Sequence, residues 1–172
     1  LWRLDTENIA AGWKKLADMP LPLVNSVMVA QQGSDTILWM IGGRTRATTG
    51  DMSEIRSELF HYSPASNSWT HKGDLRNGAN VLKFAAGTGA AIDSRHIVLF
   101  GGNDGAVFNR VEAILSAMTR ETDTAVLKQM RQEYIHMQES HPGFSRDVIL
   151  VDTENGRCFP AGEIPGPAQV TT

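Results

Sequence analysis

The sequence predicts an all-β fold built from repeated antiparallel units, a β-propeller of which only part is present. Two repeated segments predict it. A strand, a polar turn and an aromatic residue recur three times, at 2–13, 60–69 and 148–159. An apolar segment that ends in a glycine pair recurs between these units, at 36–43 and 96–102. The spacing between successive copies of these segments is typical of propeller blades.

The glycine pairs indicate the type of blade. Gly42-Gly43 and Gly101-Gly102 each follow a run of apolar residues. A kelch blade is about 50 residues long and carries such a pair after its second strand. Glycine suits this position because the chain leaves a buried strand where backbones approach closely and φ becomes positive. The sequence therefore predicts a kelch-type propeller.

The remaining elements of the blades follow in order. Residues 27–30 and 36–41 are expected to form a hairpin around the loop 31–35. In the next unit we expect a strand at 82–86, with 87–95 as the loop before the second glycine-pair strand. The glycine-pair strands are apolar at nearly every position, which favours burial on both faces. The four tryptophans recur in register with the repeat and are expected in blade cores: Trp2, Trp13, Trp39 and Trp69.

These elements divide the chain into four parts, which together amount to about two and a half to three blades. Residues 1–19 supply the end of one blade, 20–75 a full blade, 76–165 a blade with an insertion, and 166–172 the start of another. A propeller needs at least about four blades to protect its strand edges. We therefore expect further sequence on both sides of this chain in the complete protein.

The insertion follows the second glycine pair and changes the hydrophobic period. Its apolar residues take helical spacing, which predicts a helical hairpin at about 111–119 and 123–139. Asp123 is the expected N-cap of the second helix, and His141-Pro142-Gly143 ends it. The hairpin is expected to be a packing lid or a homodimer contact, and direct contact with a substrate is the alternative.

The composition of the chain excludes several classes of partner and cofactor. The chain has 172 residues, a net charge of −3 and 41% hydrophobic residues, without a basic run or an apolar segment of spanning length. Nucleic acid and membrane are therefore not expected as partners. The single cysteine, Cys158, excludes an internal disulfide. The five histidines lack metal-ligand spacing, and neither a phosphate loop nor a nucleophile motif is present, so no metal or cofactor is expected.

One combination of motifs is more specific than the repeat. Gly101–Asn109 is followed by the helical insertion, by Val148–Asp152 and by Phe159–Glu163. Over nearly its whole length the chain resembles the N-acetylneuraminate epimerases, or sialic acid mutarotases, and their cyclically permuted relatives. The resemblance implies a six-bladed periplasmic propeller that interconverts the anomers of N-acetylneuraminate without a metal or organic cofactor. The signal peptide would already have been removed.

The resemblance also implies where the chemistry lies. Ring opening and closure need a carboxylate that works as acid and base, and a cation that holds the carboxylate of the sugar acid. The family's Gly-Glu motif, with an Arg shortly after, is expected beyond Thr172, so no catalytic residue is assigned and this fragment alone is expected to be inactive. Gly162-Glu163 lacks a following Arg and is assigned to a turn.

Loop residues at the expected substrate face are the binding candidates. They are Arg44, Arg46, Asn103, Asp104 and Asn109, with Asn25 and Asn77 in loops before first strands. Asn109 has the best case because it belongs to the Phe-Asn pair shared with the family. Each candidate has the alternative role of a solvated or turn-capping side chain. A non-catalytic kelch propeller that binds a protein or a glycan remains the alternative function.

Overall fold

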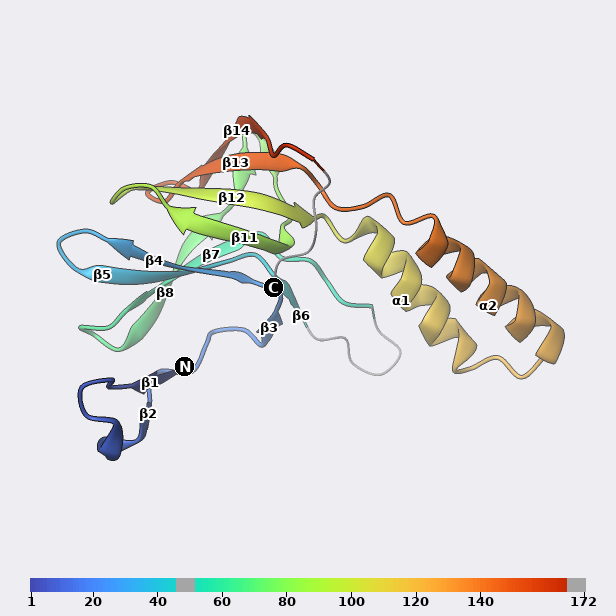
Figure 1. Cartoon of the computed structure of the whole chain (residues 1–172), viewed down its shortest axis with the longest axis horizontal. Coiled ribbons are helices and arrows are strands. Elements are labelled where there is room, and N and C mark those ends of the chain that lie inside the picture. Colours follow the sequence, from blue (N-terminus) through green and yellow to red (C-terminus); the bar gives the residue numbers. More distant parts are fainter. Residues whose placement is uncertain (46–51, 167–172) are drawn as a thin grey trace.

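A computed structural model describes residues 1–45 and 52–166. These residues form antiparallel sheets, from one end of which a helical hairpin projects (Figure 1). The first strands are β1 (Trp2–Leu4), β2 (Trp13–Lys15), β3 (Leu23–Val24), β4 (Val27–Gln32), β5 (Thr36–Ile41), β6 (Arg44–Thr45), β7 (Glu58–Ser63) and β8 (Ser68–Asp74). The later strands are β9 (Arg76–Asn77), β10 (Asn80–Val81), β11 (Ala85–Ala91), β12 (His96–Asn103), β13 (Asp147–Asp152) and β14 (Arg157–Glu163).

Two sheets have the strand order of successive blades. One runs β4-β5-β7-β8, and the other contains β11-β12-β13-β14 with β9 and β10 added beside β14. Both carry a β-bulge at the equivalent place in the third strand, between Leu59 and Phe60 and between Val148 and Ile149. A bulge bends a strand and increases its twist, so the repeat extends to local distortion of the sheet. The described residues thus form part of a β-propeller with a helical hairpin insertion, as predicted.

The core lies where the two blades face each other. Strand β4 alternates, with Val27, Val29 and Gln31 buried and the intervening residues exposed. These side chains belong to one apolar cluster with residues of the second blade, including Leu99. A Cβ added at Gly89 of β11 would lie 2.9 Å from the Leu99 side chain and 3.0 Å from Val27. Glycine in this strand therefore allows the blades to approach closely.

The glycine pairs behave as the sequence predicts. Gly43 and Gly102 have φ of +96° and +75°. A Cβ on Gly43 would lie 2.8 Å from the Ser26 side chain, and one on Gly102 would lie 2.7 Å from the Phe84 ring. Both the positive φ and the close contact thus require glycine.

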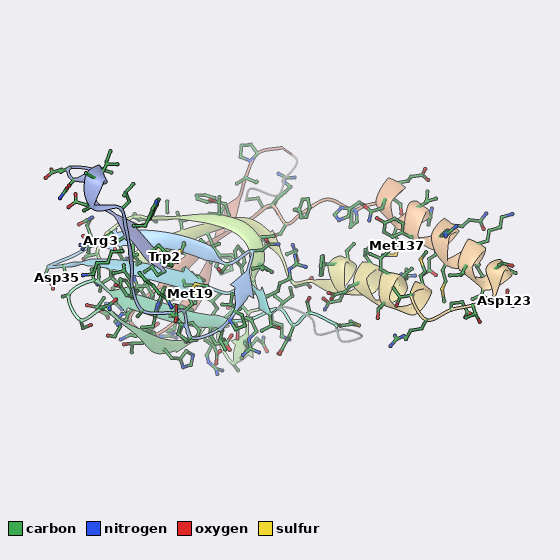
Figure 2. All side chains as sticks on the ribbon, turned by 90° about the horizontal axis from the view of Figure 1, so that it is seen from below. Trp2, Arg3, Met19, Asp35, Asp123 and Met137 are labelled. Carbon is green, nitrogen blue, oxygen red and sulfur yellow. The ribbon has the colours of Figure 1, made fainter. Side chains whose placement is uncertain are left out.

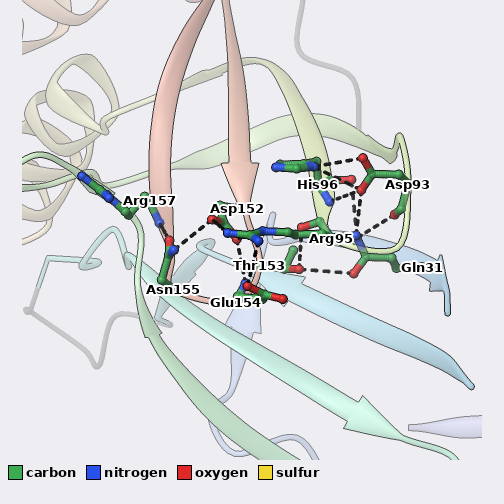
Figure 3. Close-up of polar contacts among 9 residues, drawn as sticks. All are labelled: Gln31, Asp93, Arg95, His96, Asp152, Thr153, Glu154, Asn155 and Arg157. Carbon is green, nitrogen blue, oxygen red and sulfur yellow. Dashed lines mark hydrogen bonds and ion pairs between the residues drawn. The ribbon is translucent and has the colours of Figure 1, made fainter. Parts of the chain in front are cut away.

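At the ends of the strands that lie away from the helical hairpin, polar side chains form a hydrogen-bond network (Figure 3). Arg95 donates to the Asp152 carboxylate from Nε at 3.0 Å and from Nη2 at 2.6 Å. Buried Gln31, from the first blade, donates to the Asp93 carbonyl of the second blade at 2.9 Å. Gln31 Oε1 accepts from Trp39 Nε1 at 2.6 Å, which satisfies the buried indole. The network therefore joins the two blades at the end remote from the helices.

The helical hairpin consists of α1 (Ala106–Met118) and α2 (Thr124–Glu139). Asp123, at its far tip, caps α2 as predicted by accepting from the amides of Ala125 and Val126 (Figure 2). The prediction that the first helix starts near residue 111 is wrong. It starts immediately after Gly105, because Asp104 Oδ1 accepts from the Ala106 amide at 3.0 Å and begins the helix there.

Three further expectations need correction. The strand expected at 82–86 is β11 at Ala85–Ala91, because its glycines fit the close contact between blades. Trp39 is buried, but Trp2 and Trp13 are 58% and 65% exposed in the small β1–β2 sheet. Gly162-Glu163 forms the end of β14 rather than a turn, and the Glu163 carboxylate lies 3.4 Å from Arg146 Nη2.

Candidate functional site

A pocket of about 720 Å³ opens where the blades meet the helical hairpin. Its wall combines residues of the strand ends, the first turns of α1 and the segment that returns from α2 to β13. The volume lies within the range of small-molecule sites, about 300–1,000 Å³. Charged side chains of both signs line it: Arg44, Lys83, Asp104 and Asp147. The pocket therefore offers cationic groups beside an apolar wall.

Arg44 is the buried cation of this pocket. It belongs to β6, directly after the first glycine pair, and it is only 5% exposed. Its Nε and Nη1 are buried and find no hydrogen-bond partner among the described residues. Burial lowers the pKa of the guanidinium and the Glu112 carboxylate raises it, but an arginine stays charged in either case. A buried guanidinium with free donors is suited to bind an anion.

An aromatic ring of the insertion covers this guanidinium. Arg44 Cζ lies 3.4 Å from the centre of the Phe108 ring, in a cation–π contact. Phe108 stands in α1 and lines the same pocket. One turn further along, the Glu112 carboxylate accepts from the Ser53 amide at 2.6 Å and from Ser53 Oγ at 2.7 Å. The helix is thus fixed to the loop that follows β6.

Equivalent backbone positions of the two blades also reach the pocket. Asn25, two residues before β4, and Ala86, the second residue of β11, have φ of +55° and +56° and line the pocket. The Ala86 amide donates to the Asn25 carbonyl at 2.9 Å, which links the start of β11 to the segment before β4. Left-handed backbone is costly for a residue with a side chain, and such strain concentrates at functional sites.

Asn103 and Asp104 line the pocket and also stabilise the turn into α1. Asn103 Oδ1 accepts from the Gly105 amide at 2.9 Å, and Asp104 Oδ1 accepts from the Ala106 amide. The turn-capping alternative therefore holds for one oxygen of each side chain. The second carboxylate oxygen of Asp104 and the amide nitrogen of Asn103 have no such role among the described residues.

The other candidates lie elsewhere. Asn109 stands on α1 outside the pocket wall, with its Oδ1 buried and without a hydrogen-bond partner among the described residues. Asn77 lies in β9 and lines a separate pocket of about 200 Å³. Arg46 lies outside the described residues. The structure therefore brings Asn25, Arg44, Asn103 and Asp104 together and leaves Asn77 and Asn109 apart.

Several residues of the site were missed from the sequence. Phe108 was noticed only as a family marker, while Lys83, Glu112 and Asp147 were not singled out. Phe108 and Glu112 have the i, i+4 spacing of one helix face, which would have paired them had the helix start been placed correctly. The ionisable groups of the described residues form no cluster of three metal ligands, and none of the described helices is long and apolar enough to cross a bilayer.

The sequence is similar to several curated proteins named N-acetylneuraminate epimerase. The one from Yersinia enterocolitica is 27% identical over 95% of this chain, and the one from Brucella suis is 26% identical over 95%. The Vibrio cholerae protein is 23% identical over 85%. The chain spans about 40% of the length of these relatives.

A solved structure and a family model agree with these relatives. The structure described as "Structure of YjhT" superposes with a TM-score of 0.65 over 89% of this chain and 42% of its own, at 20% identity. That likeness shows the fold. The family model described as N-acetylneuraminate epimerase matches residues 1–172, the whole chain. The chain therefore belongs to the N-acetylneuraminate epimerase family.

Proposed function

We propose that the protein carrying this sequence interconverts the α and β anomers of N-acetylneuraminate, and that this chain binds the carboxylate of the sugar acid. The observation that carries the proposal is Arg44, a buried cation in the wall of a pocket of sugar size, whose Nε and Nη1 have no hydrogen-bond partner in the part of the chain that the structure describes. Family membership supports the sugar acid as the ligand of that cation.

The carboxylate of the sugar is attached to its anomeric carbon. Holding it against the Arg44 guanidinium would therefore fix the position of the reacting centre within the pocket. A charge-assisted hydrogen bond to a buried guanidinium is stronger than a neutral one, and Phe108 on one face of the guanidinium shields it from water. Arg44 in this proposal is a binding residue that orients the substrate.

Anomer exchange moves two protons. The anomeric hydroxyl loses a proton and the ring oxygen gains one as the ring C–O bond breaks, giving the open-chain ketone. Rotation about the bond to the carbonyl carbon and closure on its other face reverse the transfers. No acid or base for these steps is assigned to this chain. We propose, on the family resemblance, that a Glu and an Arg beyond Thr172 take part, and that the protein is periplasmic.

Proton NMR of freshly released α-N-acetylneuraminate tests this function. The complete protein that contains this chain should accelerate relaxation to the β anomer well above the spontaneous rate, and Arg44→Ala in that protein should slow it, chiefly through a higher KM. Folded protein that binds the sugar acid without acceleration would instead indicate a binding propeller. Protein that neither binds nor accelerates would reject the proposal.

A further inference from the structure

The insertion and the first blade are joined by two contacts near Arg44. Glu112 of α1 accepts two hydrogen bonds from Ser53. Gly105, just before α1, faces Ile55, and a Cβ added there would lie 2.3 Å from Ile55 Cγ1. Ile55 forms a β-bridge with Arg44. The first turns of the helix are therefore held against the same loop that is paired with Arg44.

This arrangement determines where the Phe108 ring lies. Phe108 and Glu112 are one turn apart on α1, so anchoring Glu112 to Ser53 fixes the part of the helix that carries the ring. The ring lies on the guanidinium at 3.4 Å, while Nε and Nη1 stay without a partner among the described residues. Glu112 makes no ion pair with Arg44 within the described residues, so its oxygens serve Ser53 and leave the guanidinium donors free.

We propose that Glu112 is a positioning residue for anion binding: its bonds to Ser53 hold Phe108 against Arg44, which keeps the guanidinium ready for a carboxylate. The inference rests on the proposed function, since it takes the sugar carboxylate as the anion. It also gives the helical insertion a role in substrate affinity, although its tip lies far from the sheets (Figure 2).

The test separates the effect of the hydrogen bonds between Glu112 and Ser53 from the effect of the negative charge on Glu112. Glu112→Gln removes the negative charge but keeps an oxygen that accepts from Ser53. Glu112→Ala removes both, and Ser53→Ala removes one hydrogen bond while the carboxylate stays. The matched control is Glu133→Ala, which removes a carboxylate of the same hairpin that pairs with Arg110 at 2.9 Å, away from the pocket. Melting temperatures of all variants report on folding.

Isothermal titration calorimetry measures the affinity of the protein for N-acetylneuraminate and for its uncharged methyl ester. Loss of an ordered cation–π pair is expected to weaken binding of the acid by about threefold to tenfold in Glu112→Ala, and by less in Ser53→Ala. Glu112→Gln should stay within about twofold of wild type, as should Glu133→Ala, and the methyl ester should bind all variants with nearly equal affinity.

Two outcomes overturn the inference. Equal losses for the acid and the ester would show a merely structural role for Glu112, and unchanged affinity in both Glu112→Ala and Ser53→Ala would show none. If Glu112→Ala does not fold, Ser53→Ala decides. Failure of the proposed function is distinct, because then Arg44→Ala itself would leave the affinity for the acid unchanged.

Discussion

The guanidinium carbon of Arg44 lies 3.4 Å from the centre of the Phe108 ring, although the two residues come from different blades. Arg44 follows the glycine pair of the first blade, and Phe108 follows that of the second. The contact therefore depends on how the helical insertion packs against the neighbouring blade. The predictions below test this packing and the polar network around Asp152 at the other end of the strands.

Replacing the Phe108 ring should destabilise the fold modestly. Phe108→Leu removes the cation–π contact with a largely buried guanidinium and should lower the free energy of unfolding by about 1–2 kcal/mol. Phe159→Leu is the control, because Phe159 is 44% exposed, compared with 38% for Phe108, and has no such contact among the described residues. Urea titration of both variants checks this. Equal losses of unfolding free energy in the two variants would mean that the contact between Arg44 and Phe108 adds nothing to stability.

Two glycines of positive φ should differ in their tolerance of alanine. Gly105 and Gly143 have φ of +85° and +87°, but only at Gly105 would a Cβ meet another residue, Ile55. Gly143→Ala should cost about 1–2 kcal/mol for the left-handed backbone alone. Gly105→Ala should cost clearly more, because α1 must also move off Ile55. Chemical denaturation of both variants measures the difference, and equal costs would show that α1 is not packed tightly there.

Acid should weaken the network around Asp152. The Arg95 guanidinium lowers the pKa of Asp152 to about 2, from an ordinary 3.8. Because the pKa is lower in the folded state, ionised Asp152 stabilises the fold fully above about pH 4, and this contribution is lost as the pH falls through about 2. The free energy of unfolding should therefore fall between these pH values.

Asp152→Asn isolates this contribution from that of Asp93, whose pKa is also lowered to about 2, mainly by its hydrogen bond with His96. The variant should be less stable at neutral pH and should lose less stability on acidification than wild type. Exposed Asp35→Asn serves as the control. A wild-type pH slope in Asp152→Asn would contradict the account of the network.

Cys158 should be inert in the native protein. It is 4% exposed, and burial raises the pKa of its thiol to about 11, so almost no thiolate forms at neutral pH. A chromogenic disulfide reagent should react with it only as the protein unfolds, with a rate that rises with denaturant. Rapid stoichiometric reaction of folded protein would show that the core around β14 opens readily.

The sequence was sufficient to predict what local patterns determine. Gly42-Gly43 and Gly101-Gly102 indicated the blades because their role depends on backbone conformation, and Asp123 indicated a helix start because an N-cap acts within one turn. The start of α1 was missed because the chain turns into the helix at Gly105, where Asp104 accepts from the Ala106 amide, before the apolar spacing becomes helical. The Arg44–Phe108 contact and the Glu112–Ser53 bonds join segments far apart in the chain, so no periodicity could indicate them.

In the candidate site too, the residues that a local pattern marks were predicted, and those that depend on three-dimensional placement were not. Position after a glycine pair was enough to select Arg44, Asn103 and Asp104, since both pairs end at the same edge of adjacent blades. Asn109 was favoured because it belongs to the Phe-Asn pair that the chain shares with the family. On a helix, however, consecutive residues point about 100° apart, so only Phe108 reaches the pocket.

Affinity for N-acetylneuraminate, measured by titration calorimetry on wild-type protein and Arg44→Ala, tests the central claim most directly. Loss of a buried charge-assisted contact should weaken binding by at least about tenfold, with Arg44→Lys between the two. The methyl ester should bind both proteins with similar affinity. Unchanged affinity of folded Arg44→Ala for the sugar acid would contradict the claim that this pocket holds its carboxylate.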